Sequence, residues 1–251
     1  MNPTIKLIMV ARTMKNHLCR TAQVILLLLA CTCSFSGQAS ELYPKNPVER
    51  PLILPQGVGE MTIGPAFLNG NERENMQPVV NLRYALRTDL ELTILGIRYR
   101  FLNTPNYQWL AEIQNFGINN KLNHHTLIGV HGKQIFTSRL ALEYRLGAYL
   151  ADSHEKDGKT HEIRPSIKLI QKLSDNSAIE ALYARRYLSG FNQTQANLFK
   201  MNLIYTFHPN IEVIAGYGYS DFNKAVDSVL FNESYNNRYD ILIRWRFKAG
   251  G

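Results

Sequence analysis

Residues 239–247 read Tyr-Asp-Ile-Leu-Ile-Arg-Trp-Arg-Phe, and this stretch decides the fold. Successive side chains of an extended strand point to opposite faces. One face then carries only apolar and aromatic side chains: Tyr239, Ile241, Ile243, Trp245 and Phe247. The other face carries Asp240, Leu242, Arg244 and Arg246. Lipid on the first side and a polar lumen on the second satisfy both faces, whereas the reverse orientation would place each arginine in lipid at roughly 2–4 kcal/mol near the midplane.

A final strand of this kind resembles the C-terminal strand of bacterial outer-membrane β-barrel proteins. In that family the strand ends in phenylalanine, with aromatic or apolar residues at every second position before it. The resemblance implies a single antiparallel barrel in the outer membrane of a Gram-negative bacterium. It also implies that the barrel-assembly machinery reads the apolar face of this strand as an assembly signal. Here four further residues, 248–251, follow Phe247.

Residues 1–39 have the pattern of a cleaved signal peptide. Basic residues precede an apolar run at 24–30, which is too short to span a membrane. Small residues at Gly37 and Ala39 predict cleavage after Ala39. A membrane-anchoring helix is one alternative. A lipoprotein is another, because residues 28–31 resemble a lipidation box that ends in Cys31.

Cleavage after Ala39 changes both the charge and the cysteine content. The full chain of 251 residues carries a net charge of +8. Four basic residues and no acidic ones leave with the signal, so 24 basic and 20 acidic residues remain, a net charge of about +4. Nucleic-acid binding is therefore poorly motivated. All three cysteines precede the cut, so we expect neither a disulfide nor a thiolate metal site.

Residues 40–56 contain four prolines, which prevent regular strand pairing. We predict an extended periplasmic linker over this stretch. The alternative is that it folds into the lumen. Residues 57–251 form the predicted barrel domain.

Stretches of about ten alternating residues recur along that domain, separated by turn residues, which is typical of membrane barrels. The predicted strands are residues 59–68, 79–87, 90–102, 107–118, 125–136, 140–150, 161–172, 178–189, 197–207, 211–222 and 239–247. Within residues 90–102 the alternation changes phase at Leu95-Gly96, which indicates either a bulge or a tight turn between two short strands.

The connections decide between these readings. From residue 137 onward short and long connections alternate, as periplasmic turns and outer loops do. This pattern places the C-terminus in the periplasm and requires an even number of strands. We therefore predict a turn at Leu95-Gly96 and twelve strands, with ten as the alternative if the first pair lies outside the wall.

The inward positions of the predicted strands form a charge network of mixed sign. Its members are Arg83, Arg87, Arg98, Arg100, Glu112, Glu143, Arg145, Glu162, Arg164, Lys168, Glu180, Arg186, Glu212, Arg244 and Arg246. Ion pairs between them would fill a narrow lumen. The basic excess would favour anions if a pore exists.

Three functions fit this pattern. The first is a structural or surface-interaction barrel with a charged, largely closed lumen. The second is a narrow, porin-like channel for small anionic solutes. The third is an outer-membrane hydrolase, which needs a histidine beside Ser or Asp near the outer rim. His124, His125, His154 and His161 fall near predicted outer loops, but no recognised motif surrounds them. We predict no catalytic, metal or cofactor residues.

Overall fold

A computed structural model of the chain describes residues 43–70, 73–115, 125–152, 159–190, 193–222 and 237–248. The predicted signal peptide lies outside these residues. Residues 39–251 form one compact unit. No helix in the described ranges is long and apolar enough to cross a membrane.

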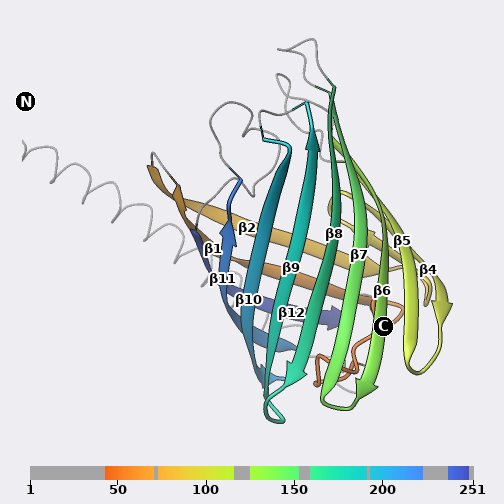
Figure 1. Ribbon diagram of the computed structural model, residues 1–251. Helices are drawn as coiled ribbons and strands as arrows, with labels where there is room; N and C mark the ends of the chain where they lie inside the picture. Colours follow the sequence, from red (N-terminus) through yellow and green to blue (C-terminus); the bar gives the residue numbers. More distant parts are fainter. Residues whose placement is uncertain are drawn as a thin grey trace, which may run out of the picture. The chain divides into compact units, whose positions relative to one another are not determined.

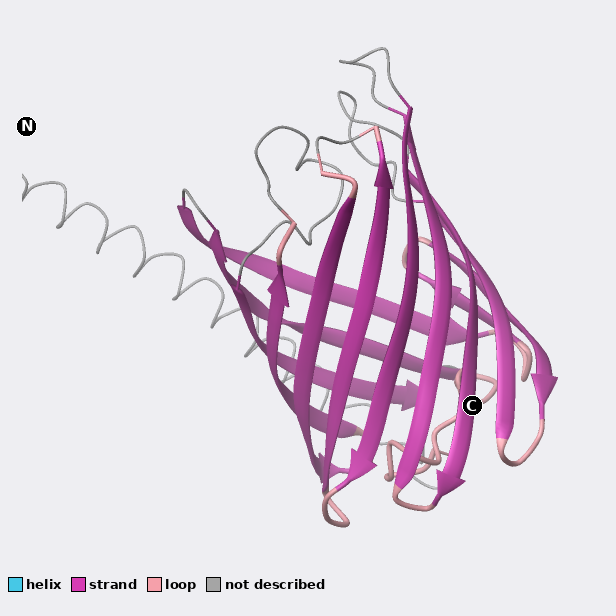
Figure 2. Cartoon of the chain, viewed as in Figure 1, coloured by secondary structure: helices cyan, strands magenta, loops and turns pink. Residues whose placement is uncertain are grey.

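The described residues form twelve antiparallel strands that close into a barrel, β1-β12-β11-β10-β9-β8-β7-β6-β5-β4-β3-β2 (Figures 1 and 2). Their bounds are β1 Val58–Gly70, β2 Arg73–Ala85, β3 Leu90–Thr93, β4 Gly96–Asn103, β5 Tyr107–Asn115, β6 His125–Thr137, β7 Leu140–Asp152, β8 Lys159–Lys172, β9 Ser177–Ser189, β10 Gln195–His208, β11 Ile211–Ser220 and β12 Asn237–Lys248. The all-β fold and the strand number are as predicted.

The phase change at Leu95-Gly96 is a tight turn. β3 and β4 form a short hairpin in which Thr93 pairs with Gly96. Gly96 also lies against β5, where a Cβ on this residue would be 2.0 Å from the carbonyl oxygen of Ile113. Only glycine allows the two backbones to approach so closely. The prediction of a turn rather than a bulge is confirmed.

Several predicted boundaries are wrong, and the largest error is at the start of β2, which begins at Arg73 rather than at residue 79. Two predicted strand ends also differ. β2 ends at Ala85 rather than Arg87, because residues 86–89 already form the turn into β3. The side chain of Arg87 is 68% exposed and pairs with Asp89 in that turn, so it is not an inward residue. β11 ends at Ser220, two residues before the predicted boundary.

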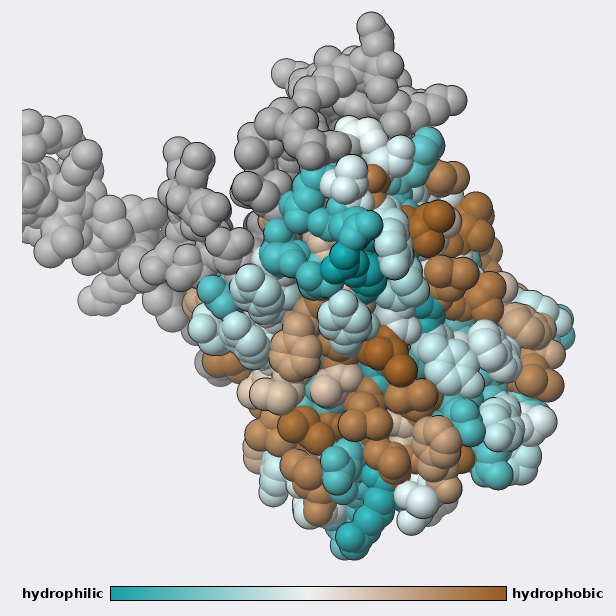
Figure 3. All heavy atoms as spheres, in the orientation of Figure 1, coloured by the Kyte–Doolittle hydropathy of each residue, from teal (hydrophilic) through white to brown (hydrophobic). Residues whose placement is uncertain are grey.

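The two faces of the strands differ as the C-terminal stretch indicates. On β12, Ile241 is exposed on the outer face, while Arg246 is buried in the lumen. Trp245 stacks on Phe247 with ring centroids 4.8 Å apart. Figure 3 shows brown apolar side chains gathered over the wall of the barrel. Exposed leucine, isoleucine and phenylalanine on this scale identify a surface that meets lipid.

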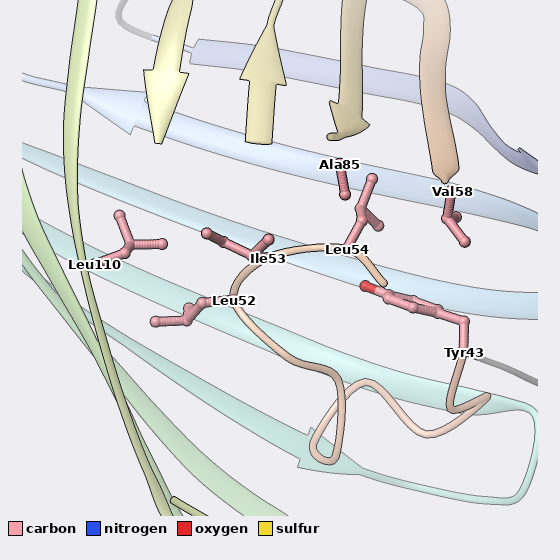
Figure 4. Close-up of a cluster of buried hydrophobic side chains, with 7 residues drawn as sticks. All are labelled: Tyr43, Leu52, Ile53, Leu54, Val58, Ala85 and Leu110. Carbon is pink, nitrogen blue, oxygen red and sulfur yellow. The ribbon is translucent and has the colours of Figure 1, made fainter. Parts of the chain in front are cut away.

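The proline-rich stretch lies inside the barrel, not outside it as a periplasmic linker. We call residues 43–57 the plug segment. Its apolar side chains pack with lumen residues of β1, β2 and β5, as Figure 4 shows. This cluster consists of Tyr43, Leu52, Ile53, Leu54, Val58, Ala85 and Leu110. Val48 packs separately against Ala141 and Ile170. The lumen was the alternative placement considered for this stretch.

The plug segment lies at the end of the barrel that holds the short connections β6–β7, β8–β9 and β10–β11, which we call the turn end. Asn46 donates a hydrogen bond of 2.6 Å to the carbonyl of Ser138 in the β6–β7 turn. Gly57, with φ of 77°, then turns the chain into β1. A positive φ favours glycine at this position.

Candidate functional site

The lumen holds the charge network that the alternation predicts, arranged around buried carboxylates. Nearest the plug segment, Glu212 accepts hydrogen bonds from Arg246 at 2.8 Å, Arg244 at 3.2 Å and Thr206 at 3.1 Å. Arg50 of the plug segment also donates to Glu212. Because all four donors reach one carboxylate, the buried negative charge is well compensated.

Two further carboxylates lie beside this group. Glu60 accepts from Arg83 at 3.1 Å and from Arg246 at 2.9 Å. Glu91 accepts from Arg83 at 2.8 Å and from Arg98 at 2.6 Å. The three carboxylates thus share their arginine partners, which links β1, β2, β3, β4, β11 and β12 across the lumen.

A second group lies in the middle of the lumen. Glu143 accepts from Lys168 at 2.6 Å and lies 3.2 Å from His131. Lys168 also lies 3.8 Å from Glu180. Arg145 pairs with Glu112, the carboxylate that also lies 3.9 Å from Arg98.

The third group lies toward the opposite end, which we call the loop end. Arg186 donates two hydrogen bonds of 2.9 Å to Glu162, and Arg164 pairs with the same carboxylate. Arg186 and Glu162 are fully buried. Arg186 also lies over the ring of Phe222 at 4.6 Å, and such a contact further stabilises a buried cation.

Two predicted members do not join the network, Arg87 in the β2–β3 turn and Arg100 on β4. Arg100 donates to the backbone carbonyl of Thr88 at the turn end, and it forms no ion pair with a carboxylate of the described residues. The other predicted members make ion pairs with one another or with Glu60 and Glu91. On the outer wall, Tyr239, Ile241, Ile243, Trp245 and Phe247 share one face of β12, and their reading by the assembly machinery stays a prediction.

The sequence analysis missed five residues that the structure brings into the network. They are Arg50, Glu60, Glu91, His131 and Lys133. Glu91 stands between Leu90 and Leu92, so the alternation alone indicates that it points inward. Glu60 likewise alternates with Met61 and Ile63, the outward residues of its strand. No comparable signal marks Arg50, because its segment has no regular period.

The middle group surrounds a cavity of about 570 Å³, which we call the charged cavity. Its lining runs from β2 to β9, eight of the twelve strands of the wall. Four basic side chains, Arg83, Arg98, Arg145 and Lys168, face two acidic ones, Glu112 and Glu143. The lining therefore carries more basic groups than carboxylates, and two of these basic groups, Arg83 and Arg98, also pair with Glu91, which is not part of the lining.

The plug segment is fixed across the turn end by hydrogen bonds to lumen side chains. The backbone N–H of Leu52 donates to Gln108 at 2.8 Å, and that of Leu54 donates to Glu91 at 3.0 Å. Lys133 donates to the carbonyls of Pro47 and Arg50 at 3.1 and 2.8 Å. A segment without strand pairing thus has its buried backbone groups satisfied by the barrel.

Arg50 is the charged anchor of the plug segment. It donates to Glu212 and to the carbonyls of Pro44 and Lys45, the last two at 2.9 and 2.6 Å. Burial lowers the pKa of this guanidinium, as does the nearby charge of Arg246, while Glu212 opposes the shift. An arginine remains charged at neutral pH, so the anchor is a charge-assisted contact.

The arrangement of strands is similar to that of solved porins. The NanC porin aligns with a TM-score of 0.57 and 12% identity, over 74% of this chain and 98% of that chain. A KdgM porin in complex with disordered oligogalacturonate aligns with a TM-score of 0.51 and 10% identity, over the same shares of the two chains. No family model and no curated protein sequence matches this chain.

The chain has the fold of an outer-membrane porin. At 10–12% identity the likeness shows the fold alone, so it assigns no solute to this barrel. Within the described residues, no histidine is hydrogen-bonded to a serine, and no three metal-binding side chains form a cluster. His124 and His154, which the hydrolase hypothesis named, lie outside those residues.

Proposed function

We propose that the protein is a porin-like channel of the outer membrane that its own plug segment holds closed at the periplasmic end. The observation that supports this proposal most directly is the position of residues 43–57 in the lumen next to the charged cavity, where Arg83 of the cavity lining donates to the carbonyl of Leu52. Its anchors are polar contacts and an apolar cluster rather than strand pairing, so the segment can leave without breaking the wall. The alternation of short and long connections supports a periplasmic position for this end.

Small anionic solutes are the class that the cavity favours. Arg145 and Lys168 are the most exposed of its basic side chains, at 32 and 24%. Each of these two side chains also forms an ion pair with a carboxylate, so the cavity attracts anions without binding them too firmly for release. A pore needs this balance between entry and release.

The experiment compares residues 40–251 with residues 57–251, each refolded and inserted into planar bilayers. Truncation at Gly57 removes the plug segment and leaves β1 whole. We expect the longer protein to be closed most of the time and the truncated protein to conduct steadily. The reversal potential in a KCl gradient should show a preference for chloride.

A structural barrel with a permanently closed lumen is the second candidate. The buried ion pair between Glu162 and Arg186 favours it, because these side chains occupy the lumen toward the loop end. It predicts no conductance in either protein. Equal conductance in both proteins would instead refute closure by the plug segment.

A further inference from the structure

The strands of the barrel wall are short at the β3–β4 hairpin. β3 has 4 residues and β4 has 8, whereas β2 and β7 each have 13. The hairpin turns back at Ile94-Leu95, where the N–H of Ile94 donates to the carbonyl of Leu82 on β2. The wall at this position therefore ends partway along β2.

Beyond that point one edge of β2 has no strand beside it in the described part of the chain. β3 pairs with β2 only at Arg83, Tyr84 and Ala85. β1 pairs with the other edge along the full length of β2. The backbone carbonyl of Leu82 points toward the β3–β4 hairpin. Every second residue before it in the sequence, beginning with Val80, therefore directs its backbone groups toward the open edge.

The next of these residues is Pro78, which has no N–H to leave unsatisfied. Proline is a common means of protecting an exposed sheet edge. The remaining backbone groups at this edge still need polar partners, because hydrocarbon cannot supply them. A polar space must therefore reach the wall at this level.

The charged cavity provides that space. Its lining includes Val80 and Asn81 on the open edge of β2 and Ile94 and Leu95 at the hairpin turn, four residues that we call the mouth. Val80 and Ile94 are 56 and 52% exposed, as are other apolar side chains of the lipid-facing wall. The cavity thus runs from basic side chains in the lumen to apolar side chains at the membrane.

We propose that this opening is a lateral binding site for a single-chain amphipathic anion drawn from the membrane. Its carboxylate would pair with Arg145 and Lys168, and its alkyl chain would pass over Ile94 and Leu95 into the bilayer. The cavity volume of about 570 Å³ is within the range of small-molecule sites, about 300–1,000 Å³. A small soluble anion would use the basic residues but would leave the apolar mouth without a function.

Two substitutions separate the mouth from general contact with lipid. Ile94→Gln changes the mouth, and Ile113→Gln changes an outward isoleucine of β5 that lies outside the cavity lining. The two side chains are equally exposed, at 52 and 51%. Arg145→Gln tests the binding site for the carboxylate of the ligand. Glu112, which pairs with Arg145, still has Arg98 at 3.9 Å in this variant.

The experiment uses residues 40–251 in phospholipid nanodiscs with a hexadecanoic acid that carries a photoreactive diazirine near the middle of its chain. Crosslinks are mapped by mass spectrometry, with and without excess palmitate or acetate. We expect crosslinks at Val80, Ile94 or Leu95 that palmitate removes and acetate does not. Losing an apolar contact or an ion pair should lower this labelling about tenfold in Ile94→Gln and in Arg145→Gln, while Ile113→Gln should stay at the unmodified level.

Crosslinks spread evenly over the wall, or equal losses in Ile94→Gln and Ile113→Gln, would mean ordinary lipid contact and would overturn the proposal. Absence of palmitate-sensitive crosslinks at the mouth would overturn it as well. Labelling does not require the plug segment to leave, so this result is independent of the conductance experiment. Heat-dependent migration in SDS gels checks that each variant is folded.

Discussion

Replacing Arg50 with alanine should open the channel without unfolding the barrel. The substitution removes the donor that joins the plug segment to Glu212, and also its hydrogen bonds to Pro44 and Lys45. Glu212 keeps Arg244, Arg246 and Thr206, so no buried carboxylate is left without a partner. The barrel itself should therefore lose little stability.

The size of the effect follows from the contacts that are lost. A hydrogen bond to a charged group contributes about 1.5–3 kcal/mol. Taking about 3 kcal/mol for the anchor as a whole, the ratio of open to closed channels rises about 100-fold, since 1.4 kcal/mol corresponds to a factor of ten. Tyr43 and the apolar cluster around Ile53 remain, so the plug segment should still close the channel part of the time.

Single-channel recording in planar bilayers measures this ratio directly as open probability. Glu49→Ala is the matched control, because Glu49 is the preceding residue of the same segment and its side chain is exposed. We expect Glu49→Ala to behave as the unmodified protein does. An open probability for Arg50→Ala within threefold of the unmodified protein, or equal opening in both variants, would refute closure through this contact.

Three further predictions concern the wall and its buried charges. Glu162→Gln leaves Arg186 without its carboxylate, so unfolding in urea, followed by tryptophan fluorescence, should show a loss of about 3–5 kcal/mol. Asp175→Ala changes a surface ion pair whose carboxylate is 95% exposed, so it should have a much smaller effect on stability. Gly96→Ala places a Cβ against a backbone oxygen, so the same assay should show a loss of stability of about 1–3 kcal/mol. Gly147→Ala should lose less, because the atom nearest to its added Cβ is a side-chain carbon at 3.1 Å. Ile53→Asp buries a carboxylate in the apolar cluster, so it should raise open probability more than Arg50→Ala does; no change in conductance would show that the cluster does not hold the plug segment.

The sequence predicts the wall well because lipid imposes a strict rule on each strand. Every second residue must be apolar, so the change of phase at Leu95-Gly96, together with the alternation of short and long connections, locates a turn inside residues 90–102. The same rule predicts that Glu143, Lys168 and Arg186 point inward. It fails at strand ends, where Arg87 and Arg100 lie near the β2–β3 turn and make local contacts there.

The plug segment could not be placed from the sequence in the same way. Its prolines exclude a strand but do not say where the segment lies. Its position depends on contacts between distant residues, such as Arg50 with Glu212 and the backbone of Leu54 with Glu91. No local period records such pairs. The mouth was missed for a similar reason, since it follows from the unequal lengths of neighbouring strands rather than from one motif.

The central claim is that the apolar faces of the strands meet lipid and the charged faces meet one another inside. The chain has two tryptophans, Trp109 and Trp245, and Trp109→Phe leaves Trp245 of β12 as the only one. Fluorescence of this variant in vesicles of brominated phospholipid tests the claim directly, because bromine quenches only tryptophans that touch acyl chains. We predict strong quenching of Trp245 by brominated lipid and little quenching by aqueous iodide. Strong quenching by iodide with none by brominated lipid would contradict the account.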